Sequence, residues 1–333
     1  MRLEDKKVLV TGGAGFIGSH LVDDLIQEGC YVKVMDNLTT GRLENLARHK
    51  DDKKFNFVKG DITEYSEVAD SMEGIDIVFH LACLGVRHSI KHSFANHRVN
   101  AEGTLFVLQE AYKKNIEKFI YCSSSEVYGT AECVPMPESH PAFPCTVYGA
   151  SKLAGEAYTR SFYKTYGFNT IILRPFNTYG PRSHHKGSAG ELIPKSIVRA
   201  LNGAPILIFG DGSQTRDYTY VEDTARALVE SAKCDEISGL TLNIGSNLEI
   251  SVNQIAENIL EMIEASSSGI EYTKNRPGDV LRLYADVTAF NKLTNWKPLV
   301  SFEEGLQKTI LWFKKRPEGA KSLLSEEKGI NWE

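Results

Sequence analysis

Short apolar runs alternate with longer amphipathic segments through the first half of the chain. Each apolar run has the length of a strand, and each amphipathic segment has the apolar spacing of a helix. Alternating strands and helices indicate βαβ units in a parallel sheet. The predicted strands are Lys7–Val10, Cys30–Met35, Asn56–Lys59, Ile75–Leu81 and Lys118–Cys122, and the predicted helices between them are Phe16–Glu28, Glu64–Met72 and Asn100–Lys114. The run at 76–81 is apolar at nearly every position, which is typical of a strand covered by helices on both faces.

The second half of the chain has a different character. A long helix is predicted from Thr146 to about Tyr166, followed by a strand at Thr170–Leu173. From about Pro175, prolines and glycines separate shorter elements. We therefore expect an α/β fold with a Rossmann-type, doubly wound parallel sheet over residues 1–175. A smaller C-terminal α/β region is expected over 176–315, with some segments returning to the sheet, and the polar residues 316–333 predict a peripheral tail.

The first chemical signal is a glycine-rich turn between a strand and a helix, with the sequence VLVTGGAGFIG at 8–18. Gly12 suits the positive φ of a tight turn, Gly15 lets the backbone approach a pyrophosphate, and Gly18 allows close helix–strand packing. The free N–H groups at the helix start then face the phosphates. Asp36 closes the second strand about 20 residues further on, where a carboxylate accepts ribose hydroxyls and disfavours a 2′-phosphate. The pattern therefore predicts NAD rather than NADP.

Three further groups of residues are candidates for cofactor binding or catalysis. Asp61 and Ile62 follow the third strand, either within reach of the adenine or with Asp61 capping the next helix. Tyr148 and Lys152 are four residues apart on one helix face, so the ammonium favours the phenolate. Such a tyrosine can take a proton from an alcohol while hydride leaves the same carbon. The serines 123–125 follow a strand and offer hydroxyls at the sheet edge where ligands of open α/β sheets bind.

Composition narrows the function classes. The 333 residues include 38 Lys+Arg and 43 Asp+Glu, and a formal net charge of −5 gives no support to nucleic-acid binding. The six cysteines are scattered without a CxxC pair, which argues against a zinc site or a disulfide framework. The start of the sequence is charged, and no stretch of ~18 apolar residues occurs. We expect a soluble cytoplasmic protein with no metal and no membrane partner.

Taken together, these motifs resemble the extended short-chain dehydrogenase/reductase family, in its NAD-dependent nucleotide-sugar epimerase/dehydratase branch. The resemblance extends to about Phe313 and rests on motifs in the expected order. They are TGGAGFIG at 11–18, Asp36-Asn37, HLA at 80–82, SSSEVYG at 123–129, YGASK at 148–152, RPFN at 174–177, QTRDY at 214–218 and RPGD at 276–279. The resemblance implies a nucleotide-diphosphate sugar as substrate.

It also implies roles for individual residues. Ser124 would hydrogen-bond the sugar O4, Tyr148 would act as base on it, and Lys152 would hold the nicotinamide ribose. The implied substrate contacts are Ser124, Ser125, Asn177 at the diphosphate, Leu192 and Phe209 beside the base, and Arg216, Arg276 and Asp279 at phosphate and ribose. The implied cofactor contacts are Gly12, Gly15, Phe16, Ile17, Gly18, Asp36, Asn37, Asp61, Ile62, Leu81, Ala82, Asn100, Ser123, Tyr148, Lys152 and Pro175.

Members of this branch share oxidation at C4 and differ in the fate of the 4-keto sugar. A 4-epimerase returns hydride to the opposite face, whereas a 4,6-dehydratase also needs a C5 base and a C6 acid. Similar hexose dehydratases typically carry Asp-Glu where this chain has Ser125 and Glu126, so the base is present and the acid is not. The motifs at 148–152 and 276–279 favour a 4-epimerase. The alternatives are a 4,6-dehydratase with Glu126 as catalytic base, then a UDP-glucuronate decarboxylase, or a purely structural Glu126.

Three further expectations follow. A non-catalytic dinucleotide-binding protein of this fold would typically lack the tyrosine or lysine, and both are present. The helices that begin at Asn100 and after Tyr148 have more apolar surface than one sheet-facing stripe needs. In this family such helices form a four-helix dimer interface, which predicts a homodimer. The loop with His184 and His185 is expected to be solvated rather than metal-binding, and Arg87 with His88 is expected near the sugar or diphosphate.

Overall fold

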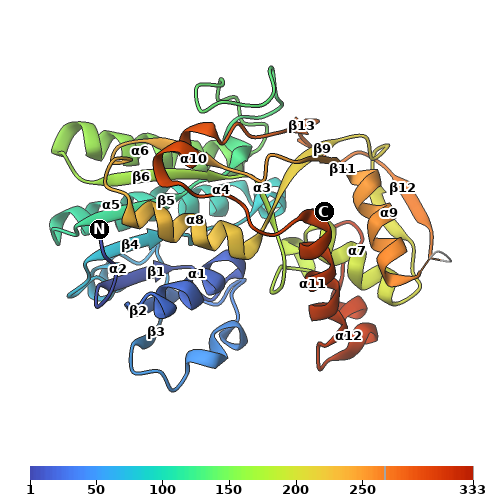
Figure 1. Cartoon of the computed structure of the whole chain (residues 1–333), viewed down its shortest axis with the longest axis horizontal. Coiled ribbons are helices and arrows are strands. Elements are labelled where there is room, and N and C mark those ends of the chain that lie inside the picture. Colours follow the sequence, from blue (N-terminus) through green and yellow to red (C-terminus); the bar gives the residue numbers. More distant parts are fainter. Residues whose placement is uncertain (266–267, 333) are drawn as a thin grey trace.

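The computed structural model of the chain describes residues 1–265 and 268–332. Figure 1 shows a sheet between helices beside a smaller part that carries β9, β11 and β12. Within the described residues the large sheet has seven strands in the order β10-β6-β5-β4-β1-β2-β3, and all neighbouring strands are parallel. Its strands are β1 (Lys7–Thr11), β2 (Tyr31–Asp36), β3 (Phe55–Lys59), β4 (Ile77–His80), β5 (Lys118–Cys122), β6 (Thr170–Pro175) and β10 (Thr241–Ile244).

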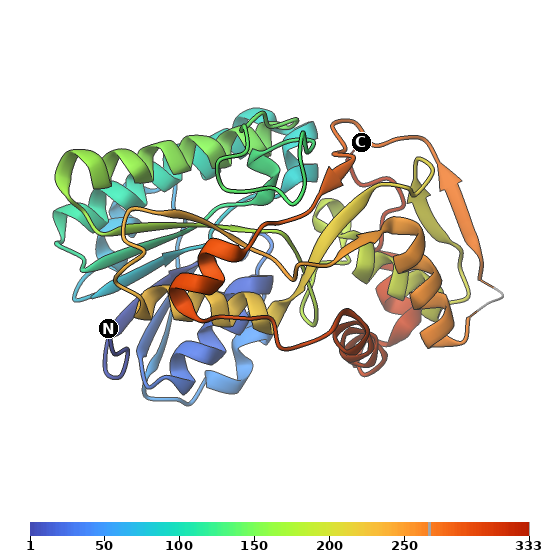
Figure 2. The same cartoon turned by 45° about the horizontal axis from the view of Figure 1, so that its top comes forward.

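Helices cover both faces of this sheet (Figure 2). Side chains alternate along β1, so Val8 and Val10 pack toward α1 and α8, while Leu9 packs toward α5 and α6. All four residues of β4 are buried, as the apolar run at 76–81 predicts. The predicted Rossmann-type doubly wound sheet is thereby confirmed. The helices of this part are α1 (Phe16–Gln27), α2 (Tyr65–Ser71), α3 (Val86–Lys91), α4 (Ser93–His97), α5 (Thr104–Lys113), α6 (Val147–Tyr166), α8 (Val221–Lys233) and α10 (Thr288–Thr294).

One predicted helix begins differently. The pattern predicts a helix from Asn100, but Arg98–Gly103 forms a wider π-helical segment and α5 begins only at Thr104. A Cβ at Gly103 would lie 2.9 Å from the Ile62 side chain, so the chain passes close to the loop after β3 here. π-Helical segments occur mostly as short insertions at functional sites. This one turns Asn100 toward the loop that follows β4.

The smaller part has its own apolar core, formed by residues that include Ile193, Ile197, Leu306 and Phe313. In it β9 pairs with β7, β11 and β13, and β8 pairs with β12. Its strands are β7 (Asn177–Tyr179), β8 (Ile206–Phe209), β9 (Thr215–Tyr220), β11 (Glu249–Ser251), β12 (Ile270–Thr273) and β13 (Arg282–Leu283). Its helices are α7 (Leu192–Leu201), α9 (Val252–Ile263), α11 (Phe302–Lys314) and α12 (Gly319–Glu326). Among the described helices, none combines the length and apolar character that a membrane crossing requires.

The chain end is less peripheral than its polar composition predicts. Residues 319–326 form α12, and Leu323 is fully buried against the core of the smaller part. Trp332 is 5% exposed. The prediction of a peripheral tail is wrong for these residues, because a few apolar side chains among many polar ones are enough to anchor the segment.

Candidate active site

The turn between β1 and α1 is packed so tightly that only glycine fits at two positions. Gly12 has φ of +71°, and a Cβ on it would lie 2.8 Å from the backbone of Ala82. A Cβ on Gly18 would overlap the Gly12 carbonyl oxygen and lie 2.9 Å from the Gly13 Cα. The start of α1 has no acidic side chain in its first turn. The turn therefore presents open backbone at a helix N-terminus, which suits a pyrophosphate.

Asp36 stands at the end of the neighbouring strand β2. Its buried carboxylate accepts hydrogen bonds from the backbone N–H of Ala14 (3.0 Å) and Leu38 (2.8 Å). Burial raises the pKa of this carboxyl. Asp61 accepts from Asn37 Nδ2 (2.8 Å) and from the backbone N–H of Thr63 (2.9 Å), which forms a local turn. It does not cap the next helix, because the N-cap of α2 is Glu64 and that helix has no side-chain cap.

The helix α6 positions the predicted proton-transfer pair. It begins at Thr146, whose side chain accepts from the Gly149 N–H, and this places Tyr148 and Lys152 in its first turns. Lys152 is buried, and its Nζ donates to the Cys122 carbonyl at the end of β5 (2.8 Å). Burial raises the pKa of the Tyr148 phenol, while the Lys152 charge and a hydrogen bond with Ser124 act in the opposite direction.

Buried polar groups support this arrangement from behind. Asn100 accepts from the Leu84 N–H (2.8 Å) and donates to the Leu84 carbonyl (2.9 Å), fixing the loop after β4. It does not line the cavity described below, and these bonds place it behind the loop that does. Ser123 lines the cavity, but its hydroxyl donates to Glu156 (2.6 Å), which also pairs with Arg174. Its hydroxyl is therefore engaged within the protein.

One cavity of about 720 Å³ joins the glycine turn, the tyrosine–lysine pair and the smaller part. With the exception of Asn100, every predicted site residue lines it, as do Arg87 and His88. The lining from the predicted set is Gly12, Gly15, Phe16, Ile17, Gly18, Asp36, Asn37, Asp61, Ile62, Leu81, Ala82, Ser123, Ser124, Ser125, Glu126, Tyr148, Lys152, Pro175, Asn177, Leu192, Phe209, Arg216, Arg276 and Asp279. The sequence did not reveal Glu191, Lys195 or Arg199, which also line the cavity from the N-cap, the first turns and the last turn of α7. No motif marks them, because they belong to an ordinary amphipathic helix.

Three arginines that line the cavity, Arg87 from α3 and Arg216 and Arg276 from the smaller part, lie near Tyr218 and are called the arginine cluster below. Arg216 pairs with Asp279 (3.0 Å), and Arg276 pairs with the same carboxylate. Burial lowers the pKa of Arg87 to about 10, so this guanidinium remains charged at neutral pH. The Nε of Arg276 is buried without a hydrogen-bond partner, although the side chain bonds elsewhere. Such a cluster suits a diphosphate, which guanidinium groups bind bidentately.

Glu126 faces the same cavity from the short 3₁₀ segment at Ser125–Val127. Its backbone N–H donates to Ser124 Oγ (3.2 Å), which fixes the residue beside the proton-transfer pair. Burial raises the pKa of its carboxyl, and the charges of Arg216 and Arg276 oppose that shift. A carboxyl with a raised pKa in a cavity suits acid or base chemistry.

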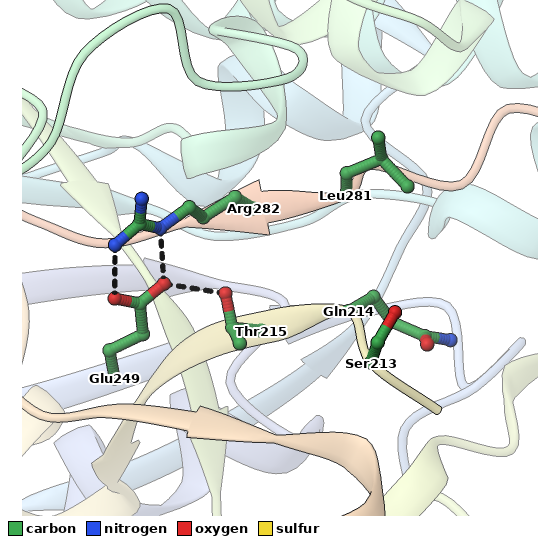
Figure 3. A pocket seen from close by; sticks show the side chains of 6 residues that line it. All are labelled: Ser213, Gln214, Thr215, Glu249, Leu281 and Arg282. Atoms are coloured by element: carbon green, nitrogen blue, oxygen red, sulfur yellow. Dashed lines mark hydrogen bonds and ion pairs between the residues drawn. The ribbon is translucent and has the colours of Figure 1, made fainter. Parts of the chain in front are cut away.

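Bonds among Thr215, Glu249 and Arg282, called the outer clamp below, connect β9, β11 and β13 next to Arg216. Two guanidinium nitrogens of Arg282 donate to the Glu249 carboxylate, and the Thr215 hydroxyl donates to the same carboxylate (Figure 3). The two Arg282 bonds measure 2.5 and 2.7 Å, and the Thr215 bond measures 2.5 Å. These residues lie on β13, β11 and β9. Because Arg216 follows Thr215 and the 276–279 segment leads into β13, the clamp fixes the relative position of the two halves of the Arg216–Asp279 pair.

The histidine loop differs from its prediction. We expected His184 and His185 to be solvated, but His185 is buried and His184 lines the cavity with its ring edge toward Phe16. Burial lowers the pKa of both imidazoles to about 4. The loop is held against α1 by Arg182, which pairs with Asp23 (2.9 Å). Across residues 1–265 and 268–332, no group of three metal-ligating side chains comes together.

A family model described as GDP-mannose 4,6 dehydratase matches residues 9–309 of the chain. The chain belongs to this family. The UDP-glucose 4-epimerase of Mycolicibacterium smegmatis is 35% identical over 315 residues, which cover 94% of this chain and 100% of the relative. The predicted branch of nucleotide-sugar enzymes is thereby confirmed.

Solved structures of an epimerase and of a dTDP-glucose 4,6-dehydratase support the same assignment. The epimerase Mth375 of Methanothermobacter thermautotrophicus matches with a TM-score of 0.89 and 36% identity, covering 94% of this chain and 93% of that one. The dTDP-glucose 4,6-dehydratase DesIV of Streptomyces venezuelae matches with a TM-score of 0.88 and 31% identity, covering 93% of this chain and 97% of that one. The DesIV structure contains NAD, the cofactor that the glycine turn and Asp36 predict here.

Proposed function

We propose that this chain is an NAD-dependent nucleotide-sugar 4-epimerase, which oxidises its substrate transiently at sugar C4. The observation that carries the proposal is the single cavity that joins three groups of residues. The glycine turn with Asp36 suits a dinucleotide, the Ser124–Tyr148–Lys152 group suits proton transfer, and the arginine cluster suits a diphosphate. An epimerase relative and an epimerase structure of similar overall fold favour the same activity.

The cofactor would be held by the first part of the chain. The backbone at Gly12 and Gly15 and the start of α1 would receive the pyrophosphate, because no side chain occupies that approach. The Asp36 carboxylate would accept the adenosine ribose hydroxyls, and Lys152 would hold the nicotinamide ribose. NAD, when bound, would supply the hydride acceptor for the C4 hydrogen and, once reduced, the hydride donor for the 4-keto sugar.

Proton transfer would fall to Tyr148, which takes the proton of the C4 hydroxyl and later returns it. Ser124 would hydrogen-bond O4 and hold it beside the phenol. Because burial raises the pKa of Tyr148, the phenolate depends on Lys152 and Ser124 to lower it again. The proposed division of labour gives residues 1–175 the cofactor and residues 176–315 the nucleotide sugar, with Leu192 and Phe209 beside the base.

The second candidate is 4,6-dehydration with Glu126 as the C5 base. Its position in the cavity and its raised pKa favour such a role. The epimerase proposal ranks first because the neighbouring position is Ser125, a buried hydroxyl residue, and not the carboxylic acid expected for departure of the C6 hydroxyl. Decarboxylation of a UDP-glucuronate-type substrate ranks third: it would not need the missing C6 acid, but the motifs at 148–152 and 276–279 favour a 4-epimerase over it.

We further propose that the chain forms a homodimer through α5 and α6. Tyr112 on α5 and Tyr166 on α6 are 40% and 53% exposed, and their rings stack at 4.8 Å to form an apolar surface. Light scattering at micromolar concentration should give twice the mass of the chain, and a monomer would contradict the proposal. A reducing cytoplasm suits the six cysteines, all of which are free thiols.

The reaction is tested by incubating the purified protein with UDP-, dTDP-, GDP- and CDP-sugars and analysing the products by mass spectrometry and NMR. An epimerase gives a product of unchanged mass with inverted C4, a dehydratase gives loss of water, and a decarboxylase gives loss of carbon dioxide. The variant Glu126→Gln tests whether Glu126 is a catalytic base. We expect the variant to retain epimerisation. Loss of C5 proton exchange together with all turnover would instead favour the 4,6-dehydratase reaction.

A further inference from the structure

Residues 327–332, called the C-terminal segment below, pack against the wall of the cavity. The chain turns back from α12 toward α7 before it ends (Figure 1). The buried Trp332 ring meets the Phe209 ring edge-on, with 4.5 Å between centroids. The backbone of Gly329 lies so close to Leu207 that a Cβ there would be 3.2 Å from the leucine side chain. Phe209 and Leu207 both line the cavity.

The same segment supplies the partners of two cationic lining residues. The Glu327 carboxylate lies 3.1 Å from Lys195 Nζ and 3.0 Å from Arg199 Nη1. Lys195 Nζ also donates to the carbonyls of Lys328 (2.6 Å) and Gly329 (2.8 Å). Two of the three donors of the Lys195 ammonium therefore bond carbonyls of the C-terminal segment, and the Glu327 carboxylate lies beside its charge. The C-terminal segment thus engages most of the hydrogen-bonding capacity of Lys195.

A third set of contacts fixes the loop that leads into α7. Asn331 Nδ2 donates to the carbonyls of Gly187 (3.1 Å) and Gly190 (2.9 Å). Leu192, expected beside the nucleobase, begins α7 two residues after Gly190. All of these contacts fall on α7, β8 and the loop before α7. The match to the family model ends at residue 309, before this segment begins.

We propose that the C-terminal segment supports the nucleobase end of the cavity, and that Trp332 is the residue that positions Phe209 against the base. The inference rests on the proposed function, which places a nucleotide sugar between Leu192 and Phe209. It goes further by assigning nucleotide affinity and base selectivity to a segment outside the matched family region. Loss of the Trp332 ring frees Phe209 to leave its position, which weakens the nucleotide without touching the NAD end.

Calorimetric titration with UDP, dTDP and GDP tests this, together with NAD titration and thermal unfolding. Trp332→Ala should weaken binding of the preferred diphosphate roughly twofold to tenfold, the range of an aromatic pair, and reduce the preference among bases. Trp332→Phe should restore most of the affinity, and NAD affinity should stay unchanged. In turnover, KM for the nucleotide sugar should rise while kcat is retained. Trp332→Leu, which keeps the buried apolar volume, serves if the alanine variant does not fold.

Trp312→Ala is the matched control. The Trp312 ring lies in α11 against Phe313 and Arg316, so its loss should lower the unfolding temperature and leave diphosphate binding unchanged. The inference alone is overturned if Trp332→Ala and Trp332→Leu bind the diphosphates as the wild type does, or if Trp312→Ala weakens them equally. A wild-type protein that binds NAD but none of the diphosphates would overturn the proposed function, and this inference with it.

Discussion

Alanine at Gly15 and at Gly18 should separate cofactor binding from the stability of the turn that provides it. A Cβ on Gly18 would lie 2.9 Å from the Gly13 Cα, whereas one on Gly15 would lie 3.1 Å from the Gly12 carbonyl oxygen as its closest contact. Non-bonded carbon atoms normally stay about 3.5 Å or more apart, so relief of the Gly13 contact alone displaces α1 by roughly 0.6 Å. The Cβ would also overlap the Gly12 carbonyl oxygen, so the displacement in Gly18→Ala must be larger than this. Overpacking of this kind costs about 1–3 kcal/mol of unfolding free energy. Gly15→Ala needs only a small shift and should keep nearly wild-type stability.

The two variants should then differ in what they lose. Gly15→Ala places its methyl group where the pyrophosphate approaches, so its Kd for NAD should rise at least about tenfold, equivalent to about 1.4 kcal/mol. Gly18→Ala should lose both stability and affinity. Urea unfolding without cofactor and calorimetric NAD titration measure the two quantities separately. Wild-type NAD affinity in Gly15→Ala would refute the placement of the pyrophosphate, and wild-type stability in Gly18→Ala would refute the packing argument.

Three other predictions concern the proton-transfer residue, the outer clamp and a buried histidine. Tyr148→Phe should lower kcat by about 10²–10⁴-fold with NAD affinity retained, and full turnover would contradict the role of the phenol as base. Glu249→Gln should weaken the clamp to Arg282 and raise KM by at most about fivefold, as for an exposed ion pair, while a fall in kcat would assign the clamp a different role. Burial, with a contribution from the Lys152 charge, lowers the pKa of His80 to about 3, so protons bind the unfolded state first as pH falls below about 6.5. As the pH falls toward 3, the unfolding free energy of the wild type should therefore decrease faster than that of His80→Gln, by up to about 1.4 kcal/mol per pH unit. If the unfolding free energies of the two proteins depend on pH in the same way, His80 is not buried in its neutral form.

The features that the sequence predicts well are those set by neighbouring residues. The strand at Lys118–Cys122 has the predicted bounds, because the apolar run that follows Lys118 ends at the serines 123–125 and permits few other limits. The glycine turn and the Tyr148–Lys152 pair are also local, since their spacing alone places them on one turn or one helix face. The parallel order of strands then brings their ends to one edge, which explains why nearly all predicted site residues line one cavity.

The features that the sequence does not reveal depend on long-range packing. The π-helical segment at Arg98–Gly103 ends where Gly103 packs closely against Ile62, which is far away in the chain. The burial of His185 follows from packing against Phe313 and Glu326, which are more than 100 residues away. Lys195 lines the cavity while its ammonium contacts the C-terminal segment, which is far away in the chain. No local pattern contains this information, so a single sequence cannot supply it.

We propose that NAD and a nucleotide sugar bind in one cavity of this protein, where the configuration at sugar C4 is inverted. NMR can follow the C4 configuration during incubation with NAD and the nucleotide sugar that binds most tightly. We expect an equilibrium mixture of the two C4 epimers, with the substrate mass conserved and no net reduction of NAD. A product that has lost water or carbon dioxide, or no reaction with any UDP-, dTDP-, GDP- or CDP-sugar, would contradict it.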